Sequence, residues 1–206
     1  MLRENYYVHS LTVLLSQGPG PVVNLRVVDV DMNAMTVWCE PPAVDPQCVK
    51  EVITRVIDEN GKSQRVMRKS SFQETIYGLE PCTDYRILVS TKSSGGLQSE
   101  EREIRNRTLD DISSEPQAFN VTEVTTTSVT LQWFRPLTNP NCATDYTLSW
   151  AGDVDTDTVT ISDTPTFKIV YIVDGLQACT NYTFTLNAES PAGSSPNTTL
   201  VQETAC

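Results

Sequence analysis

The sequence predicts an all-β protein made of two consecutive seven-stranded antiparallel β-sandwiches in a rod-like tandem. A stretch at residues 78–89, GLEPCTDYRILV, returns at residues 175–186 as GLQACTNYTFTL. In both copies apolar and polar residues alternate after the tyrosine, which is typical of a half-buried strand. No segment shows sustained helical periodicity. With 206 residues, the chain has room for two sandwiches of about 90 to 100 residues each.

The repeated stretch has the pattern of a tyrosine corner, in which a leucine precedes a tyrosine by six residues at the start of a strand. The pairs are Leu79 with Tyr85 and Leu176 with Tyr182. In such a corner the ring packs inside the sandwich and the hydroxyl bonds the backbone a few residues upstream. A single tyrosine in a strand is unremarkable, but two copies with matching surroundings favour the corner. We therefore expect Tyr85 and Tyr182 to be buried structural residues.

The first domain is predicted to span residues 21–109. Its strands are expected over residues 25–30, 35–39, 52–57 and 75–76, from residue 85 onward, and over residues 102–108. Each is a short run of alternating apolar residues bounded by turn signals. The proline-rich residues 41–46 form one loop, and the Asn60-Gly61 pair suits a tight hairpin.

Residues 110–115 are predicted to be a short polar linker, and residues 116–206 a second domain with the same plan. Its strands are expected over residues 119–124, 129–133, 146–150 and 169–172, from residue 182 onward, and in a last strand ending near residue 204, with an apolar-alternating run at Val159 and Ile161. The apolar run at residues 11–15 is too brief, and its flanks are too polar, for a signal peptide. Residues 1–20 are expected to be a flexible tail or the remnant of a preceding strand.

Beyond the repeat, the chain resembles tandem fibronectin type III domains over residues 21–206. The family's second-strand pattern is matched by Val129, Leu131, Trp133 and Pro136, its corner by residues 176–182, and the turn after its sixth strand by residues 192–193. The first copy departs from the family pattern at one place. The repeat aligns Cys39, and not Trp38, with the core tryptophan Trp133, so Trp38 is expected to point out of the sandwich.

Cysteines and glycosylation motifs favour an extracellular location. The chain contains six cysteines, which is typical of proteins that fold in an oxidising compartment. N-glycosylation motifs stand at Asn106, Asn120, Asn181 and Asn197. Strand alternation turns Asn120 and Asn181 towards solvent. No stretch approaches the roughly 20 apolar residues of a membrane span.

Charge is distributed unevenly between the two predicted domains. Residues 20–109 carry 12 basic and 13 acidic residues, whereas residues 110–206 carry 2 and 12. The acidic second domain argues against nucleic acid and anionic membrane surfaces, whose phosphates need a basic footprint. Neutral or basic proteins are the expected partners.

The residues offer no catalytic or metal site. Asp153, Asp155 and Asp157 have the spacing that opens a calcium loop, but Thr158 and Thr164 replace the required glycine and glutamate. His9 is the only histidine, which excludes triads that depend on histidine. No cysteine pair has zinc-finger spacing with further ligands. We expect no enzyme activity and no cofactor.

Two features of the first domain are candidate binding elements. The first is a basic cluster of Lys62, Arg65, Arg68 and Lys69, which suits a sulfated glycan or an acidic protein surface; a solvated charged face is the simpler interpretation. The second is Trp38, since exposed aromatic residues are enriched at binding hot spots. Covering of Trp38 by neighbouring long side chains is an equal alternative.

The geometry of the resembled fold limits how the cysteines pair. Within one sandwich, Cys48 and Cys82, or Cys142 and Cys179, lie at opposite poles, roughly 20 Å apart along a strand, which is too far for a disulfide. The far pole of the first domain faces the near pole of the second, so Cys82 is expected to pair with Cys142 and Cys179 with Cys206. Cys39 and Cys48 then pair with each other. In the alternative, Cys48 bonds a preceding domain, Cys179 bonds a following one, and Cys39 is a buried thiol.

The resemblance implies a non-catalytic extracellular protein-interaction or adhesion module from a receptor ectodomain, including receptor-type phosphatases and kinases. Its partners are then a protein ligand or neighbouring domains of the same receptor. A structural spacer in a secreted or matrix protein is one alternative. A ligand-binding pair like those of cytokine receptors is another, although the Trp-Ser-x-Trp-Ser stretch usual in such pairs is missing and residues 188–195 read AESPAGSS.

Overall fold

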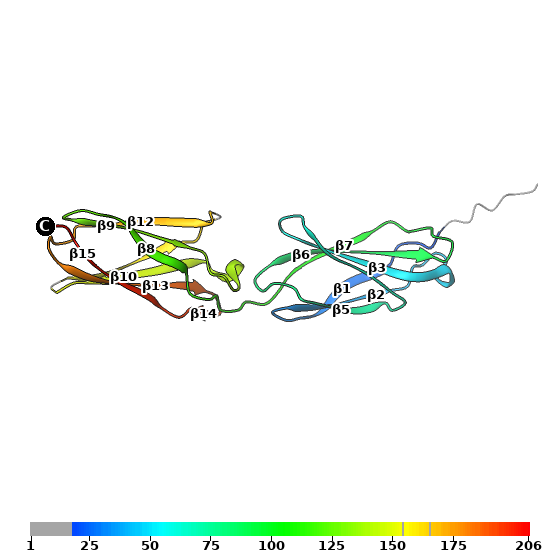
Figure 1. The fold of residues 1–206 in the computed structure, drawn as a ribbon. Helices are drawn as coiled ribbons and strands as arrows, with labels where there is room; N and C mark the ends of the chain where they lie inside the picture. The colour runs from blue at the N-terminus through cyan, green and yellow to red at the C-terminus, as the bar shows by residue number, and fades with distance from the viewer. Residues whose placement is uncertain (1–17, 154, 165) are drawn as a thin grey trace, which may run out of the picture.

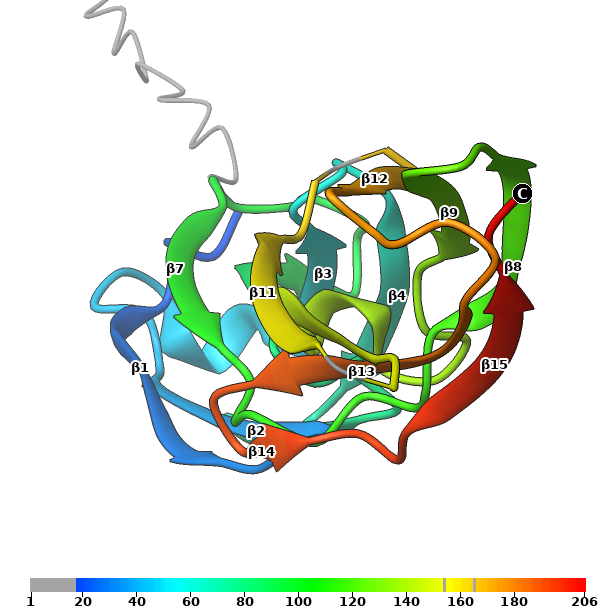
Figure 2. The ribbon, with the colours of Figure 1, turned by 90° about the vertical axis from the view of Figure 1, so that its left-hand side faces the viewer.

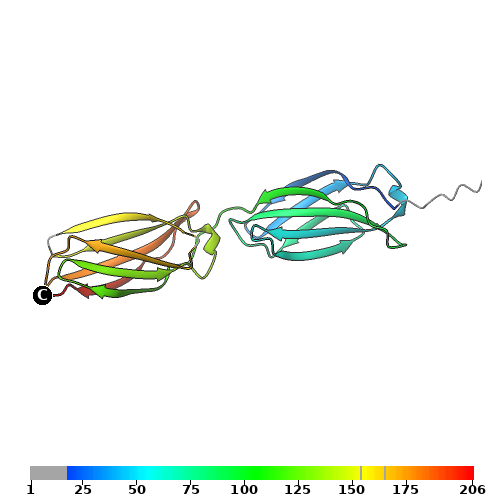
Figure 3. The same cartoon turned by 90° about the horizontal axis from the view of Figure 1, so that it is seen from above.

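The structure is a computed structural model that describes residues 18–153, 155–164 and 166–206, without the side chains of residues 63–68. The two sandwiches lie end to end along one long axis (Figures 1 and 3). Most of the predicted tail, residues 1–17, lies outside the described residues, and so does His9. No helix within the described ranges has the length and apolar character needed to cross a membrane.

The first domain pairs a three-stranded sheet with a four-stranded sheet. The first sheet has the order β1-β2-β5 and the second β4-β3-β6-β7, with every pairing antiparallel. The strands are β1 (Val23–Val30), β2 (Ala34–Glu40), β3 (Val49–Asp58), β4 (Ser63–Lys69), β5 (Gln73–Tyr77), β6 (Asp84–Ser93) and β7 (Arg102–Arg107). Strand β4 is not among the strands predicted from the sequence, because its basic residues lack the apolar alternation of the other strands.

The second domain repeats this arrangement, with sheets of order β12-β9-β8 and β11-β10-β13, the latter extended by β14 and β15 on β13. Its strands are β8 (Gln117–Val124), β9 (Ser128–Phe134), β10 (Asp145–Ala151), β11 (Thr156–Ser162), β12 (Lys168–Asp174), β13 (Asn181–Ser190), β14 (Gly193–Ser194) and β15 (Thr198–Glu203). The predicted all-β tandem of two seven-stranded sandwiches is therefore confirmed, with the two-residue β14 as an addition. Figure 2 views the rod along its axis from the second domain.

Strand alternation builds a separate core in each domain. In the second domain Trp133 is fully buried and packs edge-on against Tyr146, with ring centroids 5.7 Å apart. In the first domain Cys39 faces the core at the equivalent position, and Trp38 lies on the opposite face of β2. The offset between the repeats thus predicts correctly which of the two neighbours is buried.

A short 3-10 helix precedes the third strand of each domain, and neither helix was predicted from the sequence. They are η1 (Pro46–Cys48) and η2 (Pro140–Cys142). Each follows a residue in the left-handed conformation, Asp45 with φ 49° and Asn139 with φ 51°. Asparagine and aspartate tolerate this conformation better than most residues. The helices place a cysteine at the near pole of each domain.

Candidate functional site at the domain junction

Both tyrosine corners are present, and they fix the pole that carries a cysteine. Tyr85 and Tyr182 are buried, and their hydroxyls accept the backbone N–H groups of Glu80 at 2.9 Å and Gln177 at 3.0 Å. The Tyr182 hydroxyl also donates to Asp155 Oδ2 at 2.8 Å. Each corner therefore holds the loop that leads into its sixth strand.

A disulfide joins the far pole of the first domain to the near pole of the second. Cys82 lies in the corner loop with φ 54°, and Cys142 ends η2; their Cα atoms are 5.1 Å apart. This is the pairing that the pole argument predicts. The two cysteines are only 2% and 1% exposed, so the bond is enclosed between the domains.

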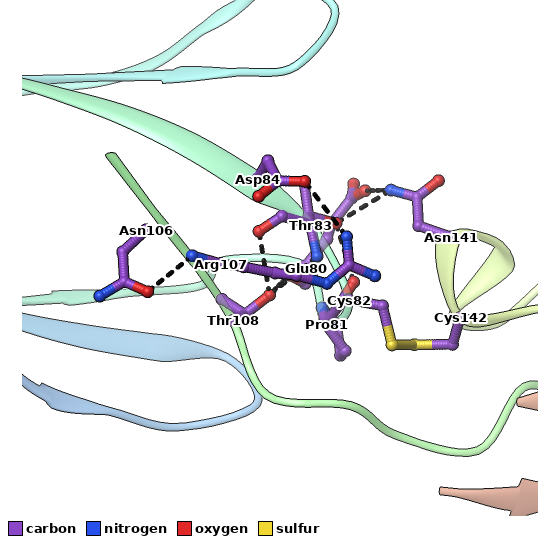
Figure 4. A network of polar contacts seen from close by, with 10 residues as sticks. All are labelled: Glu80, Pro81, Cys82, Thr83, Asp84, Asn106, Arg107, Thr108, Asn141 and Cys142. Atoms are coloured by element: carbon purple, nitrogen blue, oxygen red, sulfur yellow. Dashed lines mark hydrogen bonds and ion pairs between the residues drawn. A yellow bond between two sulfur atoms is a disulfide. The ribbon is translucent and has the colours of Figure 1, made fainter. Parts of the chain in front are cut away.

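Asn141 adds polar contacts to this junction (Figure 4). Its side-chain amide donates to Thr83 Oγ1 at 3.0 Å and to Glu80 Oε2 at 3.4 Å. Thr83 is itself fixed, because its backbone N–H donates to Thr108 Oγ1 at 3.0 Å. The Asn141 amide thus contacts the tyrosine corner of the first domain. Asn141 lies on η2, the same short helix that carries Cys142 of the disulfide.

The linker is held against the second domain. Asn139 Nδ2 donates to Asp111 Oδ2 at 2.8 Å and to the Ile112 carbonyl at 3.1 Å. Ser113 is buried and donates to the Asn139 carbonyl at 2.9 Å, and the Ser114 N–H donates to the Thr138 carbonyl at 3.1 Å. Residues 110–115 are therefore a clamped connection, which makes them less free than a polar linker of that length.

A partly buried polar network positions η2 from inside the second domain. Arg135 donates to the Pro140 carbonyl at 2.9 Å and pairs with Asp163 at 2.9 Å, and the Tyr146 hydroxyl donates to Asp163 at 2.9 Å. Burial raises the pKa of the Asp163 carboxyl, while its bonds to Tyr146 and Arg135 oppose that rise. Burial and the neighbouring Asp163 also raise the pKa of Tyr146.

An exposed apolar surface that was not predicted from the sequence lies beside the junction. We call it the β12 apolar surface; it comprises the exposed Leu137, Phe167, Val170 and Ile172 and the half-buried Phe134. Leu137 and Phe167 are 80% and 75% exposed, and the rings of Phe134 and Phe167 are 5.1 Å apart. A signal was available, since residues 169–173 read IVYIV and are apolar on both faces of the strand.

This surface continues into a groove that crosses the junction. The groove has a volume of about 340 Å³ and is lined by Glu80 and Pro81 of the first domain and by residues 137–141 of the second. Leu137 and Pro140 also line a neighbouring apolar hollow with Phe134 and Phe167. The disulfide therefore sets how the two walls of the groove face each other.

The binding candidates in the first domain receive less support. Lys69 pairs with the buried carboxylate of Glu74 at 2.6 Å, and Lys62 is exposed. The side chains of Arg65 and Arg68 lie outside the described residues, so the basic cluster stays a prediction. Trp38 points away from the core as expected, but Arg26 stacks on its ring with Cζ 4.2 Å from the centroid. Trp38 is therefore covered by a neighbouring long side chain, which is the second of the two alternatives predicted from the sequence.

The expected Cys39–Cys48 disulfide is wrong. Both are free thiols: Cys39 is buried and Cys48 is exposed. Cys39 faces the core, where its thiol donates to the Phe72 carbonyl at 3.6 Å and burial raises its pKa to about 11. Cys48 instead sits on η1 at the pole. Cys179 and Cys206 do form a disulfide, with their Cα atoms 4.6 Å apart.

The structure leaves three predicted glycosylation positions accessible. Asn120, Asn181 and Asn197 are exposed, and Asn106 is half-buried beside Thr108, whose hydroxyl donates to Glu80. Their modification stays a prediction. Within the described residues no cluster of histidine, cysteine and carboxylate side chains could hold a metal ion. Asp155 instead serves the Tyr182 corner.

Comparisons with known proteins agree with this architecture. Residues 114–204 match the family model of the fibronectin type III domain. The chain is 31% identical over 149 residues to receptor-type tyrosine-protein phosphatase S of Gallus gallus, covering 71% of this chain and 10% of that protein. It is 33% identical over 119 residues to receptor-type tyrosine-protein phosphatase F of Danio rerio, covering 57% and 6%.

A third relative is human neogenin, 24% identical over 185 residues, which cover 88% of this chain and 13% of neogenin. The chain thus spans about a tenth of the length of these curated relatives. Among solved structures, a segment of two fibronectin type III domains from chicken tenascin aligns with a TM-score of 0.44 and 16% identity, covering 89% of this chain and 99% of that chain.

The paired sheets, the two tyrosine corners and the disulfide-linked junction define a tandem of antiparallel β-sandwiches. The second domain belongs to the fibronectin type III family, since the family model matches it directly. The first domain has the same sheet order and the same corner. The first domain therefore shares the fold of the second, and the relatives above include two receptor-type tyrosine-protein phosphatases.

Proposed function

We propose that this chain is a non-catalytic protein-binding module from the extracellular part of a cell-surface receptor or adhesion protein. The observation that carries the proposal is the junction. Two covalent connections, the clamped linker and the Cys82–Cys142 bond, hold the domains at one angle. Domains joined by a modest interface move relative to each other by default, so a second tether turns the pair into a semi-rigid rod.

The β12 apolar surface is the proposed contact region for a protein ligand. Contiguous exposed apolar side chains favour protein interaction, and aromatic residues are enriched at binding hot spots. The surface lies beside the interdomain groove, so the Cys82–Cys142 disulfide also fixes its orientation towards the first domain. Arg135 and Lys168, the two basic residues of the acidic second domain, lie in or beside it. The acidic remainder of the domain favours a partner with an apolar centre and a basic rim.

Binding of the labelled 206-residue protein to intact cells tests the proposal. The double change Leu137→Ala and Phe167→Ala is expected to weaken binding at least about 30-fold, because hot-spot side chains contribute about 2 kcal/mol or more. Val201→Ala is the matched control, since Val201 is 67% exposed on the other sheet. Equal binding by all three proteins would remove the proposed surface, and no binding by any of them would favour the spacer.

A further inference from the structure

The two 3-10 helices are structural copies, so Cys48 stands on the first domain as Cys142 stands on the second. The N–H of each cysteine donates at 3.0 Å to the carbonyl of the left-handed residue before the helix, Asp45 or Asn139. Each helix then leads into an extended residue, with φ and ψ of −69° and 118° in one case and −67° and 120° in the other. The two cysteines therefore have matching backbone frames.

The corner cysteines are copies as well. Cys82 and Cys179 have φ of 54° and 53°, and their N–H groups donate to the Leu109 and Ala205 carbonyls at 3.1 and 3.2 Å. The following threonine is held identically in both, its N–H donating at 3.0 Å to Thr108 Oγ1 or Thr204 Oγ1. Cys179 therefore presents its sulfur at the far pole of the second domain as Cys82 does at the far pole of the first.

The copies differ in what covers them. Cys82 and Cys142 are buried against each other, whereas Cys48 and Cys179 are exposed at opposite poles of the rod. A groove of about 500 Å³ opens beside Cys48 and is lined in part by Val49, Ser93 and Leu97. Leu97 is an exposed apolar side chain at this pole. At the equivalent pole of the second domain, the corner of the first domain is docked.

We propose that Cys48 is a covalent docking site for the corner cysteine of another domain of this fold, in a junction built like that of Cys82 and Cys142. The inference deepens the proposed function and rests on it, because it extends the fixed geometry along an array. A second copy of this chain offers the required pole through Cys179. Gln47 would then face Thr180, as Asn141 faces Thr83.

The reaction is a thiol–disulfide exchange that needs no external oxidant. The Cys48 thiolate attacks Cys179 Sγ in the exposed Cys179–Cys206 disulfide of the other copy. The bond between Cys48 and Cys179 forms, the bond between Cys179 and Cys206 breaks, and Cys206 leaves as a thiolate that takes up the proton lost by Cys48. One disulfide is consumed and one is made.

The test incubates the purified 206-residue protein at high concentration, at about pH 8.5, where thiols ionise, under argon without reductant. Non-reducing peptide mapping is expected to find head-to-tail links between Cys48 and Cys179, with one Cys206 thiol released per link. Cys48→Ser should form none. Cys39→Ser is the matched control, and its links should match those of the wild type because Cys39 is buried.

The attack site decides the outcome. Links from Cys48 to Cys206 in equal or greater amount, or a protein that stays monomeric with an alkylatable Cys48, would overturn the proposal. Cell binding by the monomeric Cys48→Ser protein is measured separately. If the wild type forms the Cys48–Cys179 links but the Cys48→Ser protein does not bind cells, the proposed function alone is rejected; if the Cys48→Ser protein binds cells but the wild type forms no such links, the docking site alone is rejected.

Discussion

Removing one hydroxyl from the second corner isolates what the tyrosine corner contributes. Tyr182→Phe keeps a ring that is 0% exposed and deletes only the oxygen. The Gln177 N–H then loses its acceptor at 3.0 Å, and Asp155 loses its donor at 2.8 Å. Losing the part-buried bond to the Gln177 N–H costs about 1 kcal/mol, and losing the bond to the Asp155 carboxylate costs about 1.5 to 3 kcal/mol. We expect the free energy of unfolding of the second domain to fall by about 2 to 4 kcal/mol.

Urea denaturation followed by tryptophan fluorescence measures this loss, since Trp133 and Trp150 both report on the second domain. Tyr171→Phe is the matched control. The Tyr171 hydroxyl makes no hydrogen bond within the described part of the chain, so this change is expected to alter stability by less than about 0.5 kcal/mol. Equal stability of Tyr182→Phe and Tyr171→Phe would show that the corner hydroxyl does not hold the loop.

Three further predictions concern Gly152, Glu103 and the basic cluster of the first domain. Gly152→Ala is expected to destabilise the second domain by about 1 to 3 kcal/mol, because its Cβ would lie 2.7 Å from the Tyr182 ring; unchanged urea midpoints would contradict this. Bonds from Arg86 and Arg105 lower the pKa of Glu103 to about 2, so its contribution to stability is complete above its unfolded pKa and is lost as pH falls towards 2. NMR titration should show this pKa rising in Arg86→Gln. Reversal of the basic cluster to glutamate should abolish salt-sensitive retention on heparin, and unchanged retention would leave the cluster a solvated face.

The repeat explains why most of the fold was predictable from the sequence. Alternation is a local signal, and the offset between the copies identified Cys39 as the core residue and Trp38 as the outward one. The poles followed from strand order, which is why the pairing of Cys82 with Cys142 was accessible. The pairing of Cys82 with Cys142 needed only the position of each cysteine along the rod.

The prediction that failed, a disulfide between Cys39 and Cys48, depends on the direction in which each side chain points. Cys39 and Cys48 lie close in sequence, but Cys39 faces inward from β2 while Cys48 sits on η1, which has no periodic signal in three residues. The β12 apolar surface was missed for a different reason. Ile169 and Val173 face the core, and the apolar character of Val170 and Ile172 then looks like part of one buried strand. Only the sheet order shows that their face is uncovered.

Residual dipolar couplings test the central claim, a junction that holds the two domains at one angle. In the wild-type protein, one alignment tensor is expected to fit the amide couplings of both sandwiches. In Cys82→Ser/Cys142→Ser, the domains should need tensors of different magnitude, because only the clamped linker then connects them. A wild-type protein that itself requires two different tensors would contradict the account.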